Sequence, residues 1–305
     1  MSEIVKEPCG VLIVNKPQGP TSHDIVNRVR RLYSTKKVGH TGTLDPMATG
    51  VLVVPIGRAA QACEYSLSDR KQYTATLRLG IETDTEDTTG NILNEFPVNV
   101  TESDVKDVLS SFTGKIKQIP PMYSALKVGG KKLCDIAREG GTVEREAREI
   151  EVYSISADHI SDNDYRLEVE CSAGTYIRTL CADIGKALGC GGAMATLERE
   201  AACGFSIAEA HTIEEIEALS VEKRLALLRP VEDIFSEFDA VRLPAFYEKL
   251  FRSGCEIYLK KAKLPEYPAG TRLRVLDSKG EFFALGEVRE YENGPAVKSI
   301  KLFVL

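Results

Sequence analysis

Apolar and polar residues alternate along two stretches of the chain, a pattern typical of β-strands that bury one face. Every second residue from Tyr73 to Leu79 is apolar, with threonines and an arginine between them. The same alternation recurs from residue 165 to residue 171. Continuous apolar runs at residues 10–15 and 51–56 predict two more strands, of the kind that neighbours cover on both faces.

Apolar residues at helical spacing predict helices that begin after residues 21, 101 and 212. In the first, apolar residues recur three and four positions apart from Ile25 to Leu32, and Thr21 or Ser22 can cap its first turn. The second begins at a threonine with an aspartate three residues later, the arrangement of a capping box. A fourth helix is expected to follow a glycine turn at residue 174 and to end near residue 189.

Short strands separated by glycine and proline dominate the chain from about residue 241. Candidate strands lie at residues 272–276, 282–288 and 297–305. A chain of 305 residues exceeds the usual size of one small core. We therefore expect a large domain over residues 1–240 and a small β-rich domain over residues 241–305.

Composition narrows the class of protein. Hydrophobic residues make up 43% of the chain and charged residues 28%, which is ordinary for a soluble globular protein. No apolar run approaches the roughly 20 residues that span a bilayer, and the N-terminus does not resemble a signal peptide, so we expect a cytoplasmic protein that does not bind membranes. The eight cysteines are spread singly, without a C-x-x-C pair or histidines at zinc spacing, so we expect reduced thiols and no metal site.

The net charge of −6 argues against indiscriminate nucleic-acid binding, but the charge is distributed unevenly. Residues 1–80 contain 11 Lys and Arg against 6 Asp and Glu, and the remaining residues contain 28 against 39. This difference permits a basic surface that faces phosphates beside an acidic remainder. Ordinary variation along a chain explains it equally well.

The most unusual stretch is VGHTGTLDPMATGVLVV, residues 38–54, which places Asp45 among three glycines and three threonines. Glycines let the backbone approach a ligand closely, and Pro46 biases Asp45 toward an extended geometry at a turn. The apolar run that follows supplies a rigid anchor. Two interpretations fit this pattern: a turn whose aspartate accepts backbone N–H bonds, and a site that presents a reactive carboxylate.

The string GHTGTLDPMATGVLVV closely resembles the signature of the tRNA pseudouridine synthase B (TruB) family, G-H-x-G-x-L-D-P. Later segments resemble the same family in the same order, over nearly the full chain. They are the KQY segment with Tyr73, the GTYIRTL segment with Tyr176 and Arg178, and the L-x-R segment with Leu197.

The resemblance implies a fold and a set of residue roles. The implied fold is α+β, with a mixed, largely antiparallel sheet and flanking helices followed by a PUA-like RNA-binding domain. Asp45 is expected to be the catalytic nucleophile and Arg178 its charge partner. Tyr73 is expected to stack on the flipped base and to move the sugar proton. The remaining expected substrate-binding residues are His40, Tyr176 and Leu197.

A lysine-rich segment at about residues 114–150 resembles the insertion with which the family grips tRNA. This chain departs from the family pattern at Cys134, where an aromatic residue is expected, and at Ala173, which replaces a frequent lysine. An ordinary solvent-exposed surface accounts for these positive charges as well as contact with RNA does. The basic residues expected to contact RNA are Lys16, Arg28, Arg31, Lys127, Lys131 and Lys132.

The implied reaction converts the T-loop uridine at position 55 of tRNA to pseudouridine. It breaks the C1′–N1 bond and joins C1′ to C5 of the same base, so no cofactor is expected, and a monomer with tRNA as its partner suffices. The carboxylate can attack at C1′ or at C6, and the residues do not decide between these routes.

Two other functions stay open at this point. One is a relative that acts with guide RNA inside a ribonucleoprotein, and the other is a non-catalytic RNA-folding protein. A nucleotide enzyme is not expected, because the glycines of residues 39–50 lack the G-x-x-x-x-G-K-[ST] pattern of a phosphate-binding loop.

Overall fold

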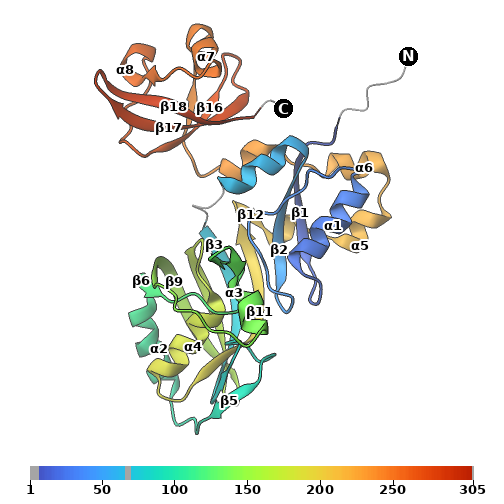
Figure 1. The fold of residues 1–305 in the computed structure, drawn as a ribbon, viewed down its shortest axis with the longest axis vertical. Helices are drawn as coiled ribbons and strands as arrows, with labels where there is room; N and C mark the ends of the chain where they lie inside the picture. Colours follow the sequence, from blue (N-terminus) through green and yellow to red (C-terminus); the bar gives the residue numbers. More distant parts are fainter. Residues whose placement is uncertain (1–6, 66–69, 304–305) are drawn as a thin grey trace.

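The computed structural model describes residues 7–65 and 70–303 (Figure 1). Its largest element is a nine-stranded sheet built from residues 10–212. In spatial order its strands are β13 (His211–Thr212), β1 (Gly10–Lys16), β2 (Thr49–Ile56), β11 (Gly192–Ala202), β3 (Arg70–Leu79), β10 (Asp164–Ser172), β9 (Arg148–Ser161) and β6 (Gly114–Gln118), with β12 (Phe205–Ser206) beside β11. The β1–β13 and β2–β11 pairs are parallel and the other pairs of this sheet are antiparallel, which confirms the predicted mixed sheet.

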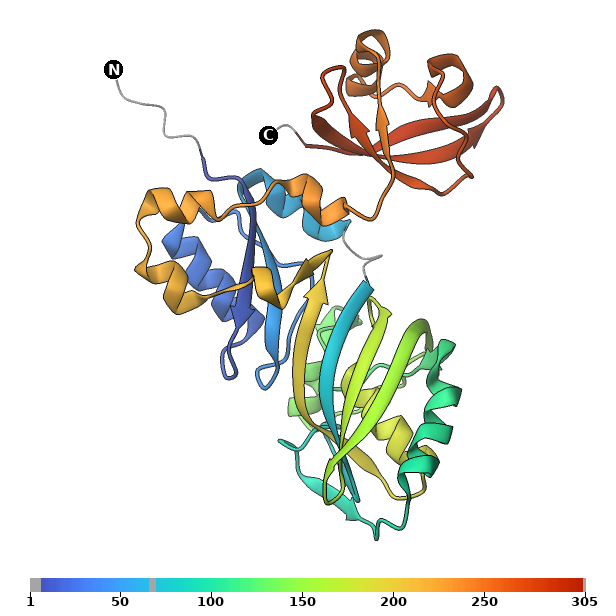
Figure 2. The same ribbon diagram turned by 180° about the vertical axis from the view of Figure 1, so that it is seen from behind.

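The alternating stretches form strands because one face of each meets a shared core. In β3 the apolar residues from Tyr73 to Leu79 are buried, and Leu167 and Val169 of the neighbouring β10 join them. Helices α2 (Glu102–Leu109) and α4 (Ile177–Ala187) cover this face of the sheet in Figure 1, whereas Figure 2 shows the opposite face in front of them.

Three helices are capped by threonines, and for the first of them, where the sequence left Thr21 and Ser22 open, the cap is Thr21. Thr21, Thr101 and Thr212 each accept a hydrogen bond from the backbone N–H three residues later, and the acidic residue there bonds back to the threonine N–H. These capping boxes satisfy N–H groups that a helix start leaves unpaired. The helices are α1 (Ser22–Leu32), α2 and α5 (Ile213–Ala218).

Strands β2 and β11 pair over a short stretch of the sheet. The two strands pair through two residue pairs, Glu198 with Thr49 and Arg199 with Gly50. Gly50 has φ +100°, and a Cβ there would lie 2.3 Å from the carbonyl oxygen of Arg199, so glycine is required for this close approach. The loop that carries Asp45 leads directly into β2 at this seam.

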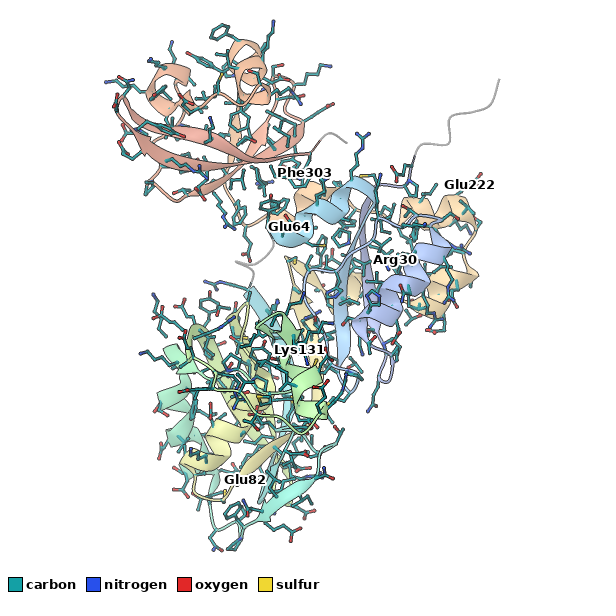
Figure 3. The ribbon with its side chains drawn as sticks, in the orientation of Figure 1. Arg30, Glu64, Glu82, Lys131, Glu222 and Phe303 are labelled. Atoms are coloured by element: carbon teal, nitrogen blue, oxygen red, sulfur yellow. The ribbon has the colours of Figure 1, made fainter. Side chains whose placement is uncertain are left out.

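The C-terminal part forms a separate five-stranded sheet, which confirms the predicted β-rich end of the chain. Its elements are β14 (Ala240–Arg242), α7 (Ala245–Arg252), β15 (Ile257–Tyr258), α8 (Leu259–Ala262), β16 (Arg272–Leu276), β17 (Phe282–Tyr291) and β18 (Gly294–Leu302). Phe303, labelled in Figure 3, packs against Phe235 of the preceding segment with ring centres 5.8 Å apart. An ion pair of 2.9 Å between Arg274 and Glu232 joins the same two parts.

The remaining elements are short and surround the large sheet. They are η1 (Gly57–Glu64), β4 (Ile81–Thr83), β5 (Ile92–Glu95), η2 (Ser110–Phe112), β7 (Lys127–Val128), β8 (Lys131–Lys132), α3 (Leu133–Arg138), η3 (Ile207–Glu209), α6 (Val221–Ala226) and η4 (Val231–Phe235). Residues 1–6 of the N-terminal segment and residues 304–305 of the last predicted strand lie outside the described residues. No helix within residues 7–65 and 70–303 is long and apolar enough to cross a membrane.

Candidate active site

Asp45 lies on the loop before β2 and faces Arg178, which belongs to the first turn of α4. The Arg178 Nε donates to the Asp45 Oδ2 at 2.9 Å. The side chain of Arg178 is 6% exposed, whereas that of Asp45 is 35% exposed. A buried guanidinium therefore holds a carboxylate that solvent and a ligand can still reach.

Arg178 is fixed by contacts with two other loops. Its Nη1 donates to the carbonyl oxygen of Thr85 at 3.0 Å, and its Nη2 donates to the carbonyl oxygen of Tyr123 at 2.7 Å. The Nη1 also lies 3.8 Å from the Oδ2 of Asp87. Because the guanidinium is planar and rigid, these bonds set the direction in which Nε presents itself to Asp45.

Lys16 anchors the Asp45 loop through hydrogen bonds to backbone carbonyl oxygens. Its ammonium donates to the carbonyl oxygens of Ala48 at 2.7 Å, Pro17 at 2.9 Å and Pro46 at 3.4 Å, and its side chain is fully buried. An ammonium has three N–H donors, so all of them are used within the protein. The prediction that Lys16 contacts RNA is therefore wrong, because the residue is buried by the fold at the end of β1.

Two more buried side chains fix this loop. Arg199 donates from Nε to the carbonyl oxygen of Val51 at 2.7 Å and from Nη2 to that of Gly42 at 3.0 Å. The Ser22 hydroxyl accepts from the backbone N–H of Leu44 at 2.8 Å, one residue before Asp45. The loop thus presents its carboxylate from a backbone held at several points, which is the preorganisation that a reactive group requires.

The buried position of Lys16 predicts a measurable effect of pH on stability. Burial lowers the pKa of Lys16 from 10.5 to about 8, although Asp45 nearby opposes this shift. Between these pH values the unfolded chain binds more protons than the folded protein, so the contribution of this group to the free energy of unfolding rises with pH, by at most about 1.4 kcal/mol per pH unit. Urea denaturation at pH 8, 9 and 10 should show this rise for the wild type relative to Lys16→Met. If the free energy of unfolding changes equally with pH in the two proteins, the expectation is contradicted.

Three other predicted substrate residues lie in elements that adjoin the Asp45 loop or Arg178. Leu44, Tyr73 and Leu197 belong to one buried cluster, with Leu197 of β11 opposite Ala75 of β3. Tyr176 is the residue before α4, and burial raises the pKa of its hydroxyl, which therefore stays protonated at neutral pH. The structure thus joins the Asp45 loop to the segment that contains Tyr176 and Arg178 and packs its Leu44 in the cluster that contains Tyr73 and Leu197.

His40 lies five residues before Asp45 on the same loop. It lines a cavity of about 870 Å³ between α1, the loop at residues 36–40, η1 and Leu302. Burial and the nearby Arg199 guanidinium lower the pKa of His40, so its ring is neutral at pH 7. Its Nδ1 is buried without a hydrogen-bond partner among the described residues.

Comparison with known families identifies the class of protein to which this site belongs. The family model described as TruB family pseudouridylate synthase (N terminal domain) matches residues 30–177. The model described as tRNA pseudouridylate synthase B C-terminal domain matches residues 178–236. The chain belongs to the TruB family. The resemblance found at residues 38–54 is thereby confirmed.

Full-length relatives of the TruB family agree with this assignment. The tRNA pseudouridine synthase B of Alkaliphilus oremlandii is 43% identical over 295 residues, which cover 96% of this chain and 98% of that protein. That of Clostridium kluyveri is 39% identical over 295 residues, covering 97% and 99%. In a crystal structure of a Cbf5-Nop10-Gar1 complex, a chain with 25% identity matches with a TM-score of 0.74, covering 97% of this chain and 85% of that chain.

The basic residues expected to contact RNA in this TruB-family chain fall into different environments. Arg28 bonds to Glu217 at 2.8 Å and to Glu214 at 3.2 Å, so its charge serves the α1–α5 contact and phosphate binding by Arg28 is not favoured. The other four expected residues are exposed, namely Arg31, Lys127, Lys131 and Lys132.

Asp87 is a site residue that the sequence interpretation missed. It is 5% exposed, its Oδ1 accepts from the hydroxyls of Thr85 and Thr89 and from the Thr89 N–H, and its Oδ2 faces Arg178. Threonines two residues to either side of one aspartate were the available signal for this network. In the described part of the chain, no group of three or more His, Cys, Asp or Glu side chains could hold a metal ion.

Proposed function

We propose that this TruB-family protein is a stand-alone tRNA pseudouridine synthase that isomerises the T-loop uridine at position 55. The observation that carries the proposal is the Asp45 carboxylate, which is partly exposed and held at 2.9 Å by the buried Arg178. Its relatives at about 40% identity over almost their full length, named tRNA pseudouridine synthase B, support tRNA as the substrate.

In the proposed mechanism, Asp45 acts as the nucleophile on a uridine that has been flipped out of its RNA. The C1′–N1 bond breaks, a C1′–C5 bond forms within the same nucleoside, and the hydrogen at C5 is released to water. Arg178 holds and aims the carboxylate through its Nε–H. Tyr73 stacks on the base, Leu197 and Tyr176 line the uridine pocket, and His40 occupies the space that the flipped nucleotide leaves.

The reaction is redox-neutral and transfers no external group, so the proposal includes no cofactor. A single chain carries the nucleophile, its charge partner and both tyrosines, which supports a monomer. We place the reaction in the cytoplasm. The guide-RNA-dependent alternative has less support, because the Cbf5 chain is 25% identical to this protein whereas the tRNA-acting relatives are about 40% identical.

The cavity beside His40 supplies a path for the RNA strand. Its basic lining residues include Arg30 (Figure 3), Lys36, Lys37 and Arg58. The cavity adjoins the Asp45 loop at one end and the C-terminal sheet at Leu302. We propose that these residues, together with the exposed lysines of the insertion and the PUA-like C-terminal domain, contact the tRNA backbone.

Charge removal in this cavity is expected to weaken tRNA binding without affecting the chemical step. The double variant Lys36→Gln/Lys37→Gln should raise KM for tRNA about tenfold and leave kcat within about twofold, because phosphate contacts act on ground state and transition state alike. A plot of the logarithm of the tRNA binding constant against the logarithm of the salt concentration should be less steep for the same variant. Lys186→Gln, an exposed lysine on α4, is the control. A fall in kcat with unchanged KM would contradict this role.

The test of the function is tritium release from a tRNA transcript labelled with [5-³H]uridine. Purified protein without added RNA or protein is expected to release the label of one uridine per tRNA. Tight binding without release would support the non-catalytic RNA-folding protein. Release that requires a second RNA would support the guide-dependent enzyme.

A further inference from the structure

The residue before helix α4 is held in an unusual way. Tyr176 occupies the N-cap position with φ −100° and ψ 108°, but its own side chain makes no capping bond. Serine, threonine, aspartate and asparagine are preferred at that position because their side chains bond to the helix. The conformation of the Tyr176 backbone therefore has to be fixed by another part of the chain.

That part is Gln118, the last residue of β6 and 58 positions earlier in the sequence. The Tyr176 N–H donates to the Gln118 Oε1 at 2.8 Å, and the Gln118 Nε2 donates to the Tyr176 carbonyl oxygen at 3.0 Å. Gln118 is 2% exposed. A side-chain amide carries one acceptor and donors in one plane, so it pairs with both backbone groups of a residue in the way that a neighbouring strand does.

The same segment reaches the site at a second point. Five residues after Gln118, the carbonyl oxygen of Tyr123 accepts from the Nη2 of Arg178 at 2.7 Å. Arg145, near the far end of the insertion, donates to the carbonyl oxygen of Pro120 at 3.0 Å. The base of the insertion is therefore bonded both to Tyr176, the residue before α4, and to Arg178 in the first turn of α4.

We propose that Gln118 is a positioning residue for the uridine pocket, which sets the Tyr176 ring against the substrate by holding both backbone groups of Tyr176. This inference rests on the proposed function, because Tyr176 is taken to line the uridine pocket. Gln118 acts through Tyr176 and does not touch the substrate itself.

The first test compares Gln118→Glu with Gln118→Met. At pH 8 the new carboxylate accepts from the Tyr176 N–H but cannot donate to the Tyr176 carbonyl oxygen, and methionine does neither. Both variants should lower kcat about 30-fold and leave KM for tRNA within about twofold, as expected for an interaction realised in the transition state. At pH 6 the Gln118→Glu deficit should shrink to below about fivefold, because a buried carboxyl is readily protonated and can then donate. The Gln118→Met deficit should stay constant.

The second test separates positioning from a general structural role. In a Tyr176→Ala background, Gln118→Met is expected to change kcat by less than about twofold, because the ring that it positions is absent. Equal losses in both backgrounds would overturn the proposal, as would a Gln118→Met protein with wild-type kcat. Thermal unfolding of each variant shows whether it is folded at the assay temperature.

A third measurement does not depend on turnover. Hydrogen exchange of the peptide that contains the Tyr176 amide should be faster in Gln118→Met than in wild type, and unchanged exchange would overturn the proposal. Failure of the proposed function gives a different result, namely no tritium release from the wild-type protein. The two failures are therefore distinguishable.

Discussion

Replacing Asp45 with asparagine is expected to abolish tritium release, with kcat at least about 10³-fold below wild type. Asparagine has the same size as aspartate, and its oxygen can still accept from Arg178, so the loop keeps its shape. The amide lacks the anionic oxygen that forms the covalent bond to the substrate. Turnover is measured with the labelled transcript, and affinity for tRNA by filter binding, which should be within about threefold of wild type.

The control for this substitution is Asp158→Asn, an exposed aspartate on β9. It removes the same charge from a different part of the surface and should leave turnover unchanged. Substantial residual turnover by Asp45→Asn would show that another group attacks the substrate. A large loss of tRNA affinity would instead assign Asp45 a role in binding.

Arg178→Lys is expected to have the second-largest effect, lowering kcat about 10²-fold. Lysine keeps the positive charge, but a single ammonium cannot reach Asp45, the Thr85 carbonyl and the Tyr123 carbonyl with the geometry of a planar guanidinium. The carboxylate then loses its orientation, although it stays close to a cation. Arg178→Met should be worse, because it also removes the charge from beside Asp45.

Steady-state kinetics on the tRNA transcript, together with thermal unfolding, measure this effect. Both variants should be folded at the assay temperature while their kcat falls. An Arg178→Lys enzyme within about threefold of wild type would mean that charge alone suffices and that the three hydrogen bonds are structural.

Local patterns were sufficient to predict the elements near the site. The alternation from Tyr73 to Leu79 predicted β3, a capping Thr21 or Ser22 predicted the start of α1, and Thr101 followed by Asp104 predicted the start of α2, because these signals depend on neighbours in sequence. The family assignment was also available from the Asp45 stretch and is confirmed. The catalytic roles of the individual residues stay predictions until they are measured.

The supports of the site could not be predicted in this way. Lys16 was expected to contact RNA, whereas the tertiary fold places the Asp45 loop over it and buries it. Arg199 lies between two glutamates in the sequence and was given no role, although it is among the largest fully buried side chains. Apart from the adjacent Pro17, the partners of both residues are carbonyl oxygens 30 or more positions away, which carry no signal in the sequence.

The contacts of Arg178 have a consequence for folding. Its partners come from residues 45, 85 and 123, so the contact set spans 133 positions of the chain and includes no local partner. Contacts between residues far apart in sequence form slowly, because long loops must close first. Recovery of turnover during refolding should therefore lag behind the recovery of helical circular dichroism, so that enzyme activity reports the last stage of folding in this domain.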